Sequence, residues 1–497
     1  MSTEETLPPN FQKLDVALRS IGYSFEAAVA DVIDNSIDAE AQNILLRLII
    51  TKDDRLDLAI WDDGKGMSQN VLKEAMRFGS DVSQEIERLG KFGLGLKLAS
   101  LSQAREVHVF TRQGNTLSGR AWLEHGIKNG FTSTVYDENE CQKLVADLVP
   151  DKKFQPSGTV VWWSGLYRVG AHSDVQEHAQ KLLNQLDNYL SLAFHRFLSG
   201  KARQAKQVRI HIDIFDQTDA HPGIPLMLDP LDPFAYPHSG QTNFPCRMYL
   251  ADPYGENVHM TAHIWPPNST AAEYRLPGGA NSRQGLYFYR NDRPIQGGSW
   301  NGLRETEPHS SLARVEIDVS PEFDLEVSLD VKKIEIHLPQ SLKNAIQKAQ
   351  TETGVDFKKY LALADDAYRK RQITNAELPV IPSKGLPAKL VTSLRAELQI
   401  SATSKFRELE FVWTTLPDEQ FFEIDRDAAC ICLNRTYRPV VLRGLRGSVA
   451  DVPLLKCLLF FVLEEAVSSE RMSSRIRERV AKVNRILVKA VKYERGL

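Results

Sequence analysis

The stretch from Leu89 to Ser100, LGKFGLGLKLAS, sets three glycines and two lysines directly before an apolar pattern with helical spacing. Glycine costs backbone entropy, so a fold keeps it where φ must be positive or where a ligand approaches the main chain closely. Free amides in such a turn, the start of the following helix and the charge of Lys97 would together attract an anion. The stretch therefore predicts a phosphate-binding loop, although the glycine spacing by itself is more typical of an ordinary flexible turn.

The segment before this loop predicts a helix with an unusual polar face. Residues 24–41, SFEAAVADVIDNSIDAEA, repeat valine and isoleucine at helical spacing, while Asp31, Asn35 and Asp38 fall on the opposite face. An asparagine oxygen is a ligand that Mg²⁺ accepts while the ion shares phosphate oxygens. A solvated helix face is the alternative interpretation of these carboxylates.

A strand end and a later strand complete the pattern. Residues 43–67, NILLRLIITKDDRLDLAIWDDGKGM, predict two strands around a turn. The second strand ends at Asp62, before Gly64 and Gly66. A lone carboxylate there is usually a turn former, but one followed by Gly-x-Gly can accept a hydrogen bond from a base amine while the backbone comes close. SGTVVWWSGL predicts a further strand with Thr159 near its start. The irregular alternation of strands and helices predicts an α+β sandwich.

In this order, the four pieces resemble the GHKL ATPases, which include gyrase B, the ninety-kilodalton heat-shock chaperones, sensor histidine kinases, MutL and the MORC proteins. DVIDNSIDA is similar to the first box of that family, WDDGKGM to its Asp-x-Gly-x-Gly box, GKFGLGLK to its lid glycine box and SGTVV to its threonine strand. The resemblance covers roughly the first third of the chain. It implies a GHKL α/β sandwich with ATP and magnesium as cofactors.

The resemblance also implies roles for individual residues. Asn35 would hold magnesium, Asp62 would accept from the adenine amine, and Thr159 would support that hydrogen-bond network. Hydrolysing members carry glutamate four residues before the asparagine, where this chain has Asp31, one methylene shorter. Asp31 would still reach a water as general base, with slow turnover. The other implied nucleotide contacts are Gly64, Gly66, Met67, Gly90, Lys91, Phe92, Gly93, Leu94, Gly95 and Lys97.

The length of 497 residues exceeds the size at which a single core keeps growing, so several domains are expected. We expect the GHKL ATP-binding domain in residues 1–200 and a transducer domain of ribosomal-protein-like fold in residues 201–345. Residues 346–497 should form a mixed, mainly helical region of unknown role with a basic terminal helix. Few residues precede the first box, which argues against the histidine kinase layout, in which a dimerising helix comes first.

Two stretches of the expected second domain indicate which branch of the family the chain resembles most. GLYFYRNDRPI resembles the strand and turn of MutL and MORC transducers, and DVKKIEIHLP resembles the strand that ends in a γ-phosphate-sensing lysine. We assign this catalytic contact to Lys333, with Lys332 as the alternative. Side chains alternate along a strand, so only one of the two lysines can reach the nucleotide. An exposed edge lysine is the other interpretation.

Composition sets few limits on the partners. Lys and Arg number 61 and Asp and Glu 64, a net charge of −3, so global charge names no partner. Five cysteines, an odd number, argue against a disulfide framework and for a reducing compartment. There is no signal-peptide pattern, and no apolar run approaches the ~20 residues of a membrane helix. We therefore expect a cytoplasmic protein without a membrane partner.

Two features in the last third of the chain allow more than one interpretation. Cys430 and Cys432 fall on one face of a predicted strand, where they are either core residues or, less favoured, part of a metal site. Residues 471–497 contain nine basic and two acidic residues, and their apolar residues recur at helical spacing. Such a helix binds nucleic acid or a partner helix, or it is a solvated face on a packed helix.

The layout is nearest to prokaryotic MORC-like and MutL-like proteins. The resemblance implies an ATPase that forms a homodimeric clamp on ATP binding, with DNA as its client. The alternative is a chaperone-like or signalling ATPase whose dimerisation acts on a protein partner, such as an effector encoded nearby. Relatives of this layout often belong to anti-phage systems, so a role in antiviral defence follows by analogy alone.

Overall fold

The computed structural model describes residues 13, 24–77, 95–128, 132–151, 157–167, 174–203, 205–219, 222–251, 253–255, 257–267, 269–320, 328–329, 336–374, 380–398, 406–426, 428–442, 447–468 and 473–494. The chain divides into two compact units. The first contains Met1–Asp232, Tyr289–Ile295 and Val319–Glu335, and the second contains Pro233–Phe288, Gln296–Asp318 and Ile336–Leu497.

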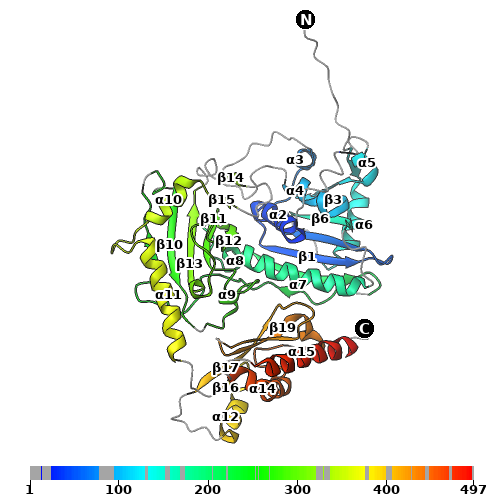
Figure 1. Cartoon of the computed structure of the whole chain (residues 1–497). Helices are drawn as coiled ribbons and strands as arrows, with labels where there is room; N and C mark the ends of the chain where they lie inside the picture. The colour runs from blue at the N-terminus through cyan, green and yellow to red at the C-terminus, as the bar shows by residue number, and fades with distance from the viewer. Residues whose placement is uncertain are drawn as a thin grey trace. The chain divides into compact units, whose positions relative to one another are not determined.

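The first unit is built on an eight-stranded sheet in the order β5-β4-β3-β6-β2-β1-β7-β8, drawn from blue to green in Figure 1. Its strands are β1 (Asn43–Ile50), β2 (Leu56–Asp62), β3 (Ala104–Gln113), β4 (Thr116–Trp122), β5 (Thr134–Tyr136), β6 (Ser157–Leu166), β7 (Arg209–Asp216) and β8 (Leu226–Met227). Neighbouring strands are antiparallel except β1 and β7, which are parallel. The hairpin of β1 and β2 and the later strand β6, both predicted from the sequence, are confirmed.

Helices cover both faces of this sheet. They are α2 (Phe25–Asp38), α3 (Gln69–Ala75), α4 (Gly95–Gln103), α5 (Glu124–Lys128), α6 (Glu138–Leu148), α7 (Val175–Ala193) and α8 (His195–Leu198). Alternate residues of β1 enter two different cores: Leu46 and Leu48 pack with α2, α4 and α7, whereas Leu45 and Ile49 pack with α6. Because side chains of a strand alternate between faces, the two cores lie on opposite sides of the sheet. The predicted α/β sandwich is confirmed.

The strand β7 differs from its expected place. The sequence assigns residues from 201 onward to a second domain, but β7 pairs in parallel with β1, with Asn43 opposite Arg209 and Ile50 opposite Asp216. Buried Ile210 and Ile212 of β7 belong to the core under α7. The first compact unit consequently extends to Asp232. Alternation of apolar residues predicts a strand but not which strand it pairs with.

The second unit contains a five-stranded sheet in the order β12-β11-β13-β10-β9. These strands are β9 (Cys246–Met248), β10 (Val258–Ile264), β11 (Gly285–Arg290), β12 (Arg293–Gly297) and β13 (Ala313–Val319). The segment Tyr289–Ile295, which ends β11 and begins β12, clusters with the first unit. The strands β14 (Ser328–Leu329), which lies in the first unit, and β15 (Ile336–His337) form a two-stranded pair. The helices of the second unit up to this point are α9 (Ala272–Arg275), α10 (Gln340–Lys348) and α11 (Phe357–Thr374). The ribosomal-protein-like fold of this region stays a prediction.

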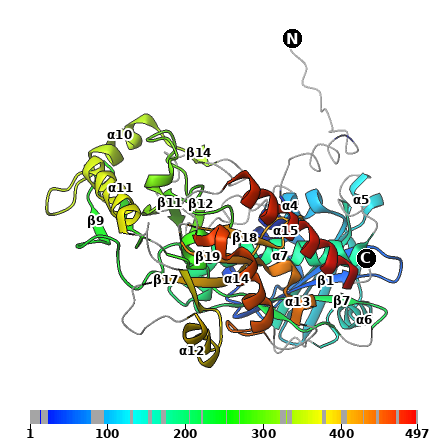
Figure 2. The same cartoon turned by 60° about the horizontal axis from the view of Figure 1, so that its bottom comes forward.

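The last part of the chain is mixed and mainly helical, as predicted. A four-stranded sheet in the order β16-β17-β19-β18 packs with long helices. Its elements are β16 (Val380–Lys384), α12 (Ala388–Glu397), β17 (Arg407–Thr414), β18 (Phe422–Asp425), β19 (Cys430–Asn434), α13 (Arg438–Leu442), α14 (Pro453–Ser468) and α15 (Ser474–Glu494). Figure 2 shows α14 and α15 side by side, and both contribute to the core of this sheet.

Two details of this part concern the sequence predictions. The proline-rich stretch ELPVIPSKGLP, which reads as a boundary, contains β16, and this strand lies at the sheet edge, where proline costs no ladder bond. Cys430 and Cys432 both lie buried on β19 with their sulfurs 3.9 Å apart, which confirms the predicted strand. Within the described ranges, no helix is both long and apolar enough to cross a membrane.

Candidate functional site

The carboxylate of Asp62 lies buried at the end of β2, in the middle of the first sheet. Its Oδ1 accepts a hydrogen bond from the Gly64 amide at 2.9 Å, and its Oδ2 accepts one from the Ser36 hydroxyl at 2.9 Å. Burial raises the pKa of Asp62 from its ordinary value of 3.8 to about 6. The Thr159 backbone amide also donates to this carboxylate. A carboxylate has about four acceptor sites, so three donors still leave capacity for one more, such as a base amine.

Ser36 ties this carboxylate to α2. The serine directly follows Asn35 on the helix, and the 2.9 Å bond from its Oγ to Asp62 spans 26 residues of sequence. The helix that carries Asp31 and Asn35 is therefore fastened to the strand end that carries Asp62. The sequence analysis missed Ser36, because a serine on a helix that is rich in polar residues gives no signal of its partner.

A pair of threonines adjoins Asp62 on the neighbouring strands. Thr159 on β6 lies opposite Asp62 in the ladder, and Thr111 on β3 lies opposite Thr159. The two hydroxyls are 3.2 Å apart, and the Thr111 hydroxyl accepts a hydrogen bond from the Met67 amide at 2.9 Å. This network joins the predicted site residues Met67 and Thr159. Thr111 itself was missed, because only the strand register places it there.

The glycines after Asp62 fit against the protein's own backbone. Gly66 has a φ of +63°, and a Cβ on it would lie 1.9 Å from the carbonyl oxygen of Arg112. A Cβ on Gly64 would lie 2.9 Å from the carbonyl oxygen of Ala39. Both glycines are thus required by the turn that leaves β2, whether or not a ligand also approaches them.

The neighbouring Asp63 has a separate role in this turn. Its Oδ1 accepts hydrogen bonds from the backbone amides of Gln42 and Asn43, both at 2.8 Å, at the start of β1. The two adjacent carboxylates therefore have different partners, and only Asp62 faces the helix α2.

Asp31 and Asn35 lie one helical turn apart on α2, as predicted, but in different environments. Ser24 caps the helix by accepting from the Ala27 amide at 3.2 Å, which sets where α2 begins. Asp31 is 7% exposed, so it is not the solvated carboxylate of the alternative interpretation, whereas Asn35 is exposed. The Asn35 Nδ2 donates to the main-chain oxygen of Asp31 at 3.0 Å. The amide nitrogen is thereby engaged, and Oδ1 is the end that suits a hard cation.

The exposed Asn35 suits a magnesium ion that is shared between the protein and the phosphates of a nucleotide. In the part of the chain that the structure describes, no group of three or more His, Cys, Asp or Glu side chains could hold a metal ion. Mg²⁺ typically binds through one or two protein oxygens and completes its shell with water and substrate phosphates. A single exposed asparagine oxygen beside a nucleotide meets that requirement.

The helix α4, which begins at Gly95, packs against α2 and brings Lys97 into the same region of the unit. Lys97 is 2% exposed, and its burial lowers the pKa of the ammonium, an effect that the negative charge of Glu74 opposes. Other predicted contacts lie outside the described residues, namely Gly90, Lys91, Phe92, Gly93 and Leu94, together with Lys332 and Lys333.

Asp34, which the sequence analysis did not select, is the most buried carboxylate of α2. It is 1% exposed, and its Oδ1 accepts from Nε of Arg293 at 3.0 Å. Arg293 follows it by 259 residues and belongs to the same compact unit. The motif that contains Arg293, RNDRPI, resembled a transducer turn, but no sequence feature indicated its partner.

Together these features define a nucleotide-binding α/β sandwich with a buried carboxylate at a strand end, next to a helix that carries an aspartate and an asparagine one turn apart. Residues 23–153 match the family described as "Histidine kinase-, DNA gyrase B-, and HSP90-like ATPase". This part of the chain therefore matches the GHKL ATPase family, as the resemblance implied, and the match supports ATP binding.

Known proteins of the MORC group are similar to part of the chain. It is 33% identical over 90 residues to Protein MICRORCHIDIA 6 of Arabidopsis thaliana, covering 17% of this chain and 13% of that protein. It is 32% identical over 99 residues to ATPase MORC2B of Mus musculus, covering 18% of this chain and 9% of that protein. The match thus spans about a tenth of the length of these relatives.

A solved structure, the N-terminal domain of a DNA repair protein, aligns with 70% of this chain and 95% of its own length. The TM-score is 0.38 and the identity 14%, so this likeness has no bearing on function.

Proposed function

We propose that the first unit binds ATP with Mg²⁺ and hydrolyses it. In this proposal Asp62 accepts a hydrogen bond from the adenine amine, with Thr159 beside it, and Asn35 holds the ion against the phosphates. The loop from Gly90 to Gly95 and Lys97 contact the phosphates. Asp31 takes the proton of the attacking water. Bound magnesium would supply charge neutralisation on the phosphate oxygens.

The hydrogen bond between Ser36 and Asp62 carries this proposal. It joins the expected adenine acceptor to the residue that follows the expected magnesium ligand, at 2.9 Å and in a buried position. Three of the four sequence motifs, which are far apart in the chain, contribute residues around the end of β2. Burial also raises the pKa of Asp62 to about 6, a shift of the kind that is frequent at functional sites.

Calorimetric titration of the full chain with a non-hydrolysable ATP analogue in Mg²⁺ tests the binding step directly. We expect one site per chain, with affinity that falls when Mg²⁺ is replaced by a chelator. Absence of heat in the presence of Mg²⁺, with a folded protein by circular dichroism, would contradict the proposal.

We further propose that ATP closes two copies of the chain into a homodimeric clamp, with Lys333 contacting the γ-phosphate. A ligand shifts a conformational equilibrium only through its preference for one state, and the γ-phosphate alone distinguishes ATP from ADP. Support for this step comes from resemblance, since Lys332, Lys333 and the glycine loop lie outside the described residues.

The Lys333→Ala variant is expected to bind the ATP analogue and stay monomeric, because the charge-assisted contact that favours the closed state is lost. Lys332→Ala is the matched control and should dimerise like the parent. Size-exclusion chromatography with light scattering measures both masses. A parent whose mass is the same with ADP and with the analogue would refute the clamp, and reversed phenotypes would assign the contact to Lys332.

DNA is the client that we propose, and the terminal helix supplies a surface for it. One side of α15 packs on the four-stranded sheet through Val488 and Val491. Its exposed basic residues are Arg475, Arg477, Arg479, Lys482, Arg485, Lys489 and Lys492, and its exposed acidic residues are Glu478 and Glu494. Such an excess of positive charge along about 30 Å of helix matches a phosphate backbone.

The double variant Lys482→Glu/Lys489→Glu is expected to lower affinity for duplex DNA at least tenfold in about 0.1 M salt, because two phosphate contacts become repulsive. Lys358→Glu/Lys359→Glu, which makes the same charge change at exposed positions of α11, is the control and should have a much smaller effect. Fluorescence anisotropy across a salt series measures both. Equal losses in the two variants would argue for global charge instead of a site on α15.

A protein client is the second candidate, and one observation favours it. Leu454, Leu458 and Phe461 are more than half exposed along one side of α14. Exposed apolar side chains at such spacing are typical of partner-binding helices. A client bound there would show little salt dependence, in contrast to DNA.

An effector encoded nearby and a role in defence against phage belong to this proposal by resemblance only. Plating of phage on cells with and without the gene would test the defence role.

We place the protein in the cytoplasm because all five cysteines, which lie in described parts of the chain, are free thiols.

A further inference from the structure

The chain reverses between β11 and β12 through a two-residue turn that clusters with the first unit. Asn291 and Asp292 have φ values of 46° and 64°. Positive φ at both central residues defines a type I′ turn, which matches the twist of the strands that it joins. The turn brings Tyr289, Asp292 and Arg293 together at the end of this hairpin.

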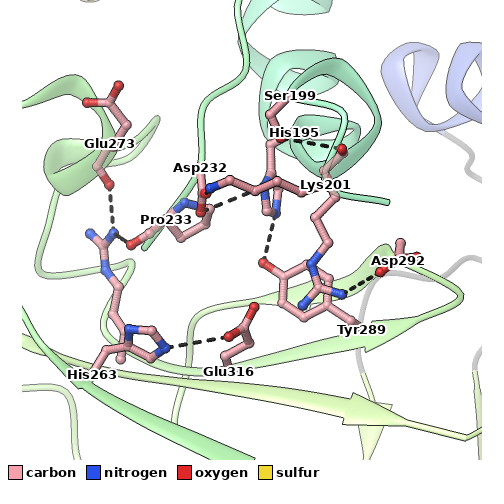
Figure 3. A network of polar contacts seen from close by, with 12 residues as sticks. His195, Ser199, Lys201, Asp232, Pro233, His263, Glu273, Tyr289, Asp292 and Glu316 are labelled. Carbon is pink, nitrogen blue, oxygen red and sulfur yellow. Dashed lines mark hydrogen bonds and ion pairs between the residues drawn. The ribbon is translucent and has the colours of Figure 1, made fainter. Parts of the chain in front are cut away.

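Asp292 and Tyr289 anchor this turn on α8. The Asp292 carboxylate accepts from Nη1 of Arg196 at 2.9 Å and from the Arg203 amide at 2.7 Å. The Tyr289 hydroxyl is 2.9 Å from Nε2 of His195, and Figure 3 shows both side chains converging there. The guanidinium of Arg196 also lies over the Tyr289 ring, 3.7 Å from its centroid. Several buried contacts thus hold the turn in one place.

Arg293 extends from the same turn to α2. Its Nε donates to Asp34 at 3.0 Å, its Nη1 donates to the carbonyl oxygen of Ala193 at 3.0 Å, and its guanidinium lies 4.2 Å from the centroid of the Phe194 ring. Burial lowers the pKa of Arg293, but the charges of Asp34 and Asp31 outweigh this effect and raise it. The arginine therefore connects the end of α7 with the helix that carries Asp31 and Asn35.

We propose that Arg293 is a positioning residue for ATP hydrolysis, which holds α2 through Asp34 so that Asp31 and Asn35 keep their places relative to the nucleotide. The inference rests on the proposed ATPase function. β11 and β12 belong to the five-stranded sheet and continue into the turn, and the ion pair of Arg293 with Asp34 links this turn to α2.

The split between kcat and ATP affinity tests this role. Arg293→Met keeps the length of the side chain but removes the charge, and we expect kcat to fall at least tenfold because small displacements of catalytic groups are costly. The affinity for ATP measured without Mg²⁺ should stay within threefold, because Asn35 acts through the ion. Asp62 and Thr159 lie on β2 and β6, whereas Arg293 bonds to α2 and to the end of α7. Arg293→Lys keeps the charge, but an ammonium lacks the planar fork that donates to both Asp34 and the Ala193 carbonyl oxygen. We therefore expect an intermediate kcat.

A double-mutant cycle separates positioning from general damage. If Arg293 acts through Asp34, the double variant Asp34→Asn/Arg293→Met should lose no more kcat than the worse single variant. Arg203→Gln is the control, because its side chain is 60% exposed and also pairs with Asp292. It should match the parent.

Equal kcat in the parent and in Arg293→Met, or single losses that multiply in the double variant, would overturn the positioning role. A parent that binds no ATP in the calorimeter would overturn the proposed function and this inference with it. Unchanged ATP affinity also shows that each variant is folded.

Discussion

Replacing Asp31 with asparagine is expected to lower ATP turnover at least about a hundredfold, the usual contribution of a general base. The amide has nearly the same shape but cannot take a proton from water. Asp31 lies one turn before Asn35 on α2 and is almost buried, so a substitution of the same size should preserve the helix. ATP affinity should therefore stay within about threefold of the parent, and turnover by phosphate release measures the loss.

Two variants on the same helix serve as controls for Asp31. Asp31→Glu introduces the glutamate of hydrolysing family members and should keep turnover within about tenfold of the parent. Glu26→Gln removes a carboxylate from the first turn of α2 and should leave turnover unchanged. An Asp31→Asn protein that hydrolyses ATP at the parent rate would show that the base is elsewhere or is not needed.

Replacing Asp62 with asparagine is expected to weaken ATP binding more than tenfold. The carboxylate that accepts from the base amine is lost, and a buried mismatch costs about 1 to 3 kcal/mol. The local structure should survive, since Asn can still accept from the Gly64 amide and the Ser36 hydroxyl can turn to accept from the new amide. Calorimetric titration with ATP measures the change.

The same substitution is expected to stabilise the protein at neutral pH. The pKa of Asp62 is about 6 when folded, against an ordinary value of 3.8, so the folded state binds more protons between these values. Stability from this group therefore falls as pH rises from about 4 to 6, and its burial cost is fully present above pH 6. Asp62→Asn removes this cost, so its free energy of unfolding at pH 7.5 should exceed that of the parent by about 1 to 3 kcal/mol.

Urea unfolding at pH 7.5 and pH 4.5 measures this second effect, and the difference between the proteins should shrink at the lower pH. Asp63→Asn is the matched control, because Asp63 pairs with the start of β1 and not with α2. It should keep the ATP affinity of the parent. An Asp62→Asn protein with parental ATP affinity would remove Asp62 from the site.

The local elements of the first unit follow from the sequence because their signals are local. Strand patterns predict β1, β2 and β6, and helical spacing of valine and isoleucine predicts α2. The placement of Asp31 and Asn35 on one face is a consequence of the 3.6-residue helical repeat. The burial of Asp31 was not predictable in this way, because it depends on what packs over the helix.

Pairings between distant segments are a different matter. The serine–aspartate bond that closes the site spans 26 residues, and the ion pair of Arg293 with Asp34 spans 259. Thr111 enters the site only because β3 pairs with β6 in a register that sets it opposite Thr159. No periodicity in the chain carries this information, since registers and docking contacts are selected by how all the elements pack together.

By itself, the sequence determined that this protein has a GHKL α/β sandwich at its N-terminal end and a mixed, mainly helical region at the other, because motif order and apolar periodicity are written along the chain. Only the tertiary structure decided that β7 joins the first sheet, that Ser36 and Thr111 surround the strand end at Asp62, and that the turn containing Arg293 belongs with the first unit. These outcomes depend on which buried polar groups find partners. Burial makes an unpaired charge or hydroxyl costly, and only the complete fold can satisfy each of them.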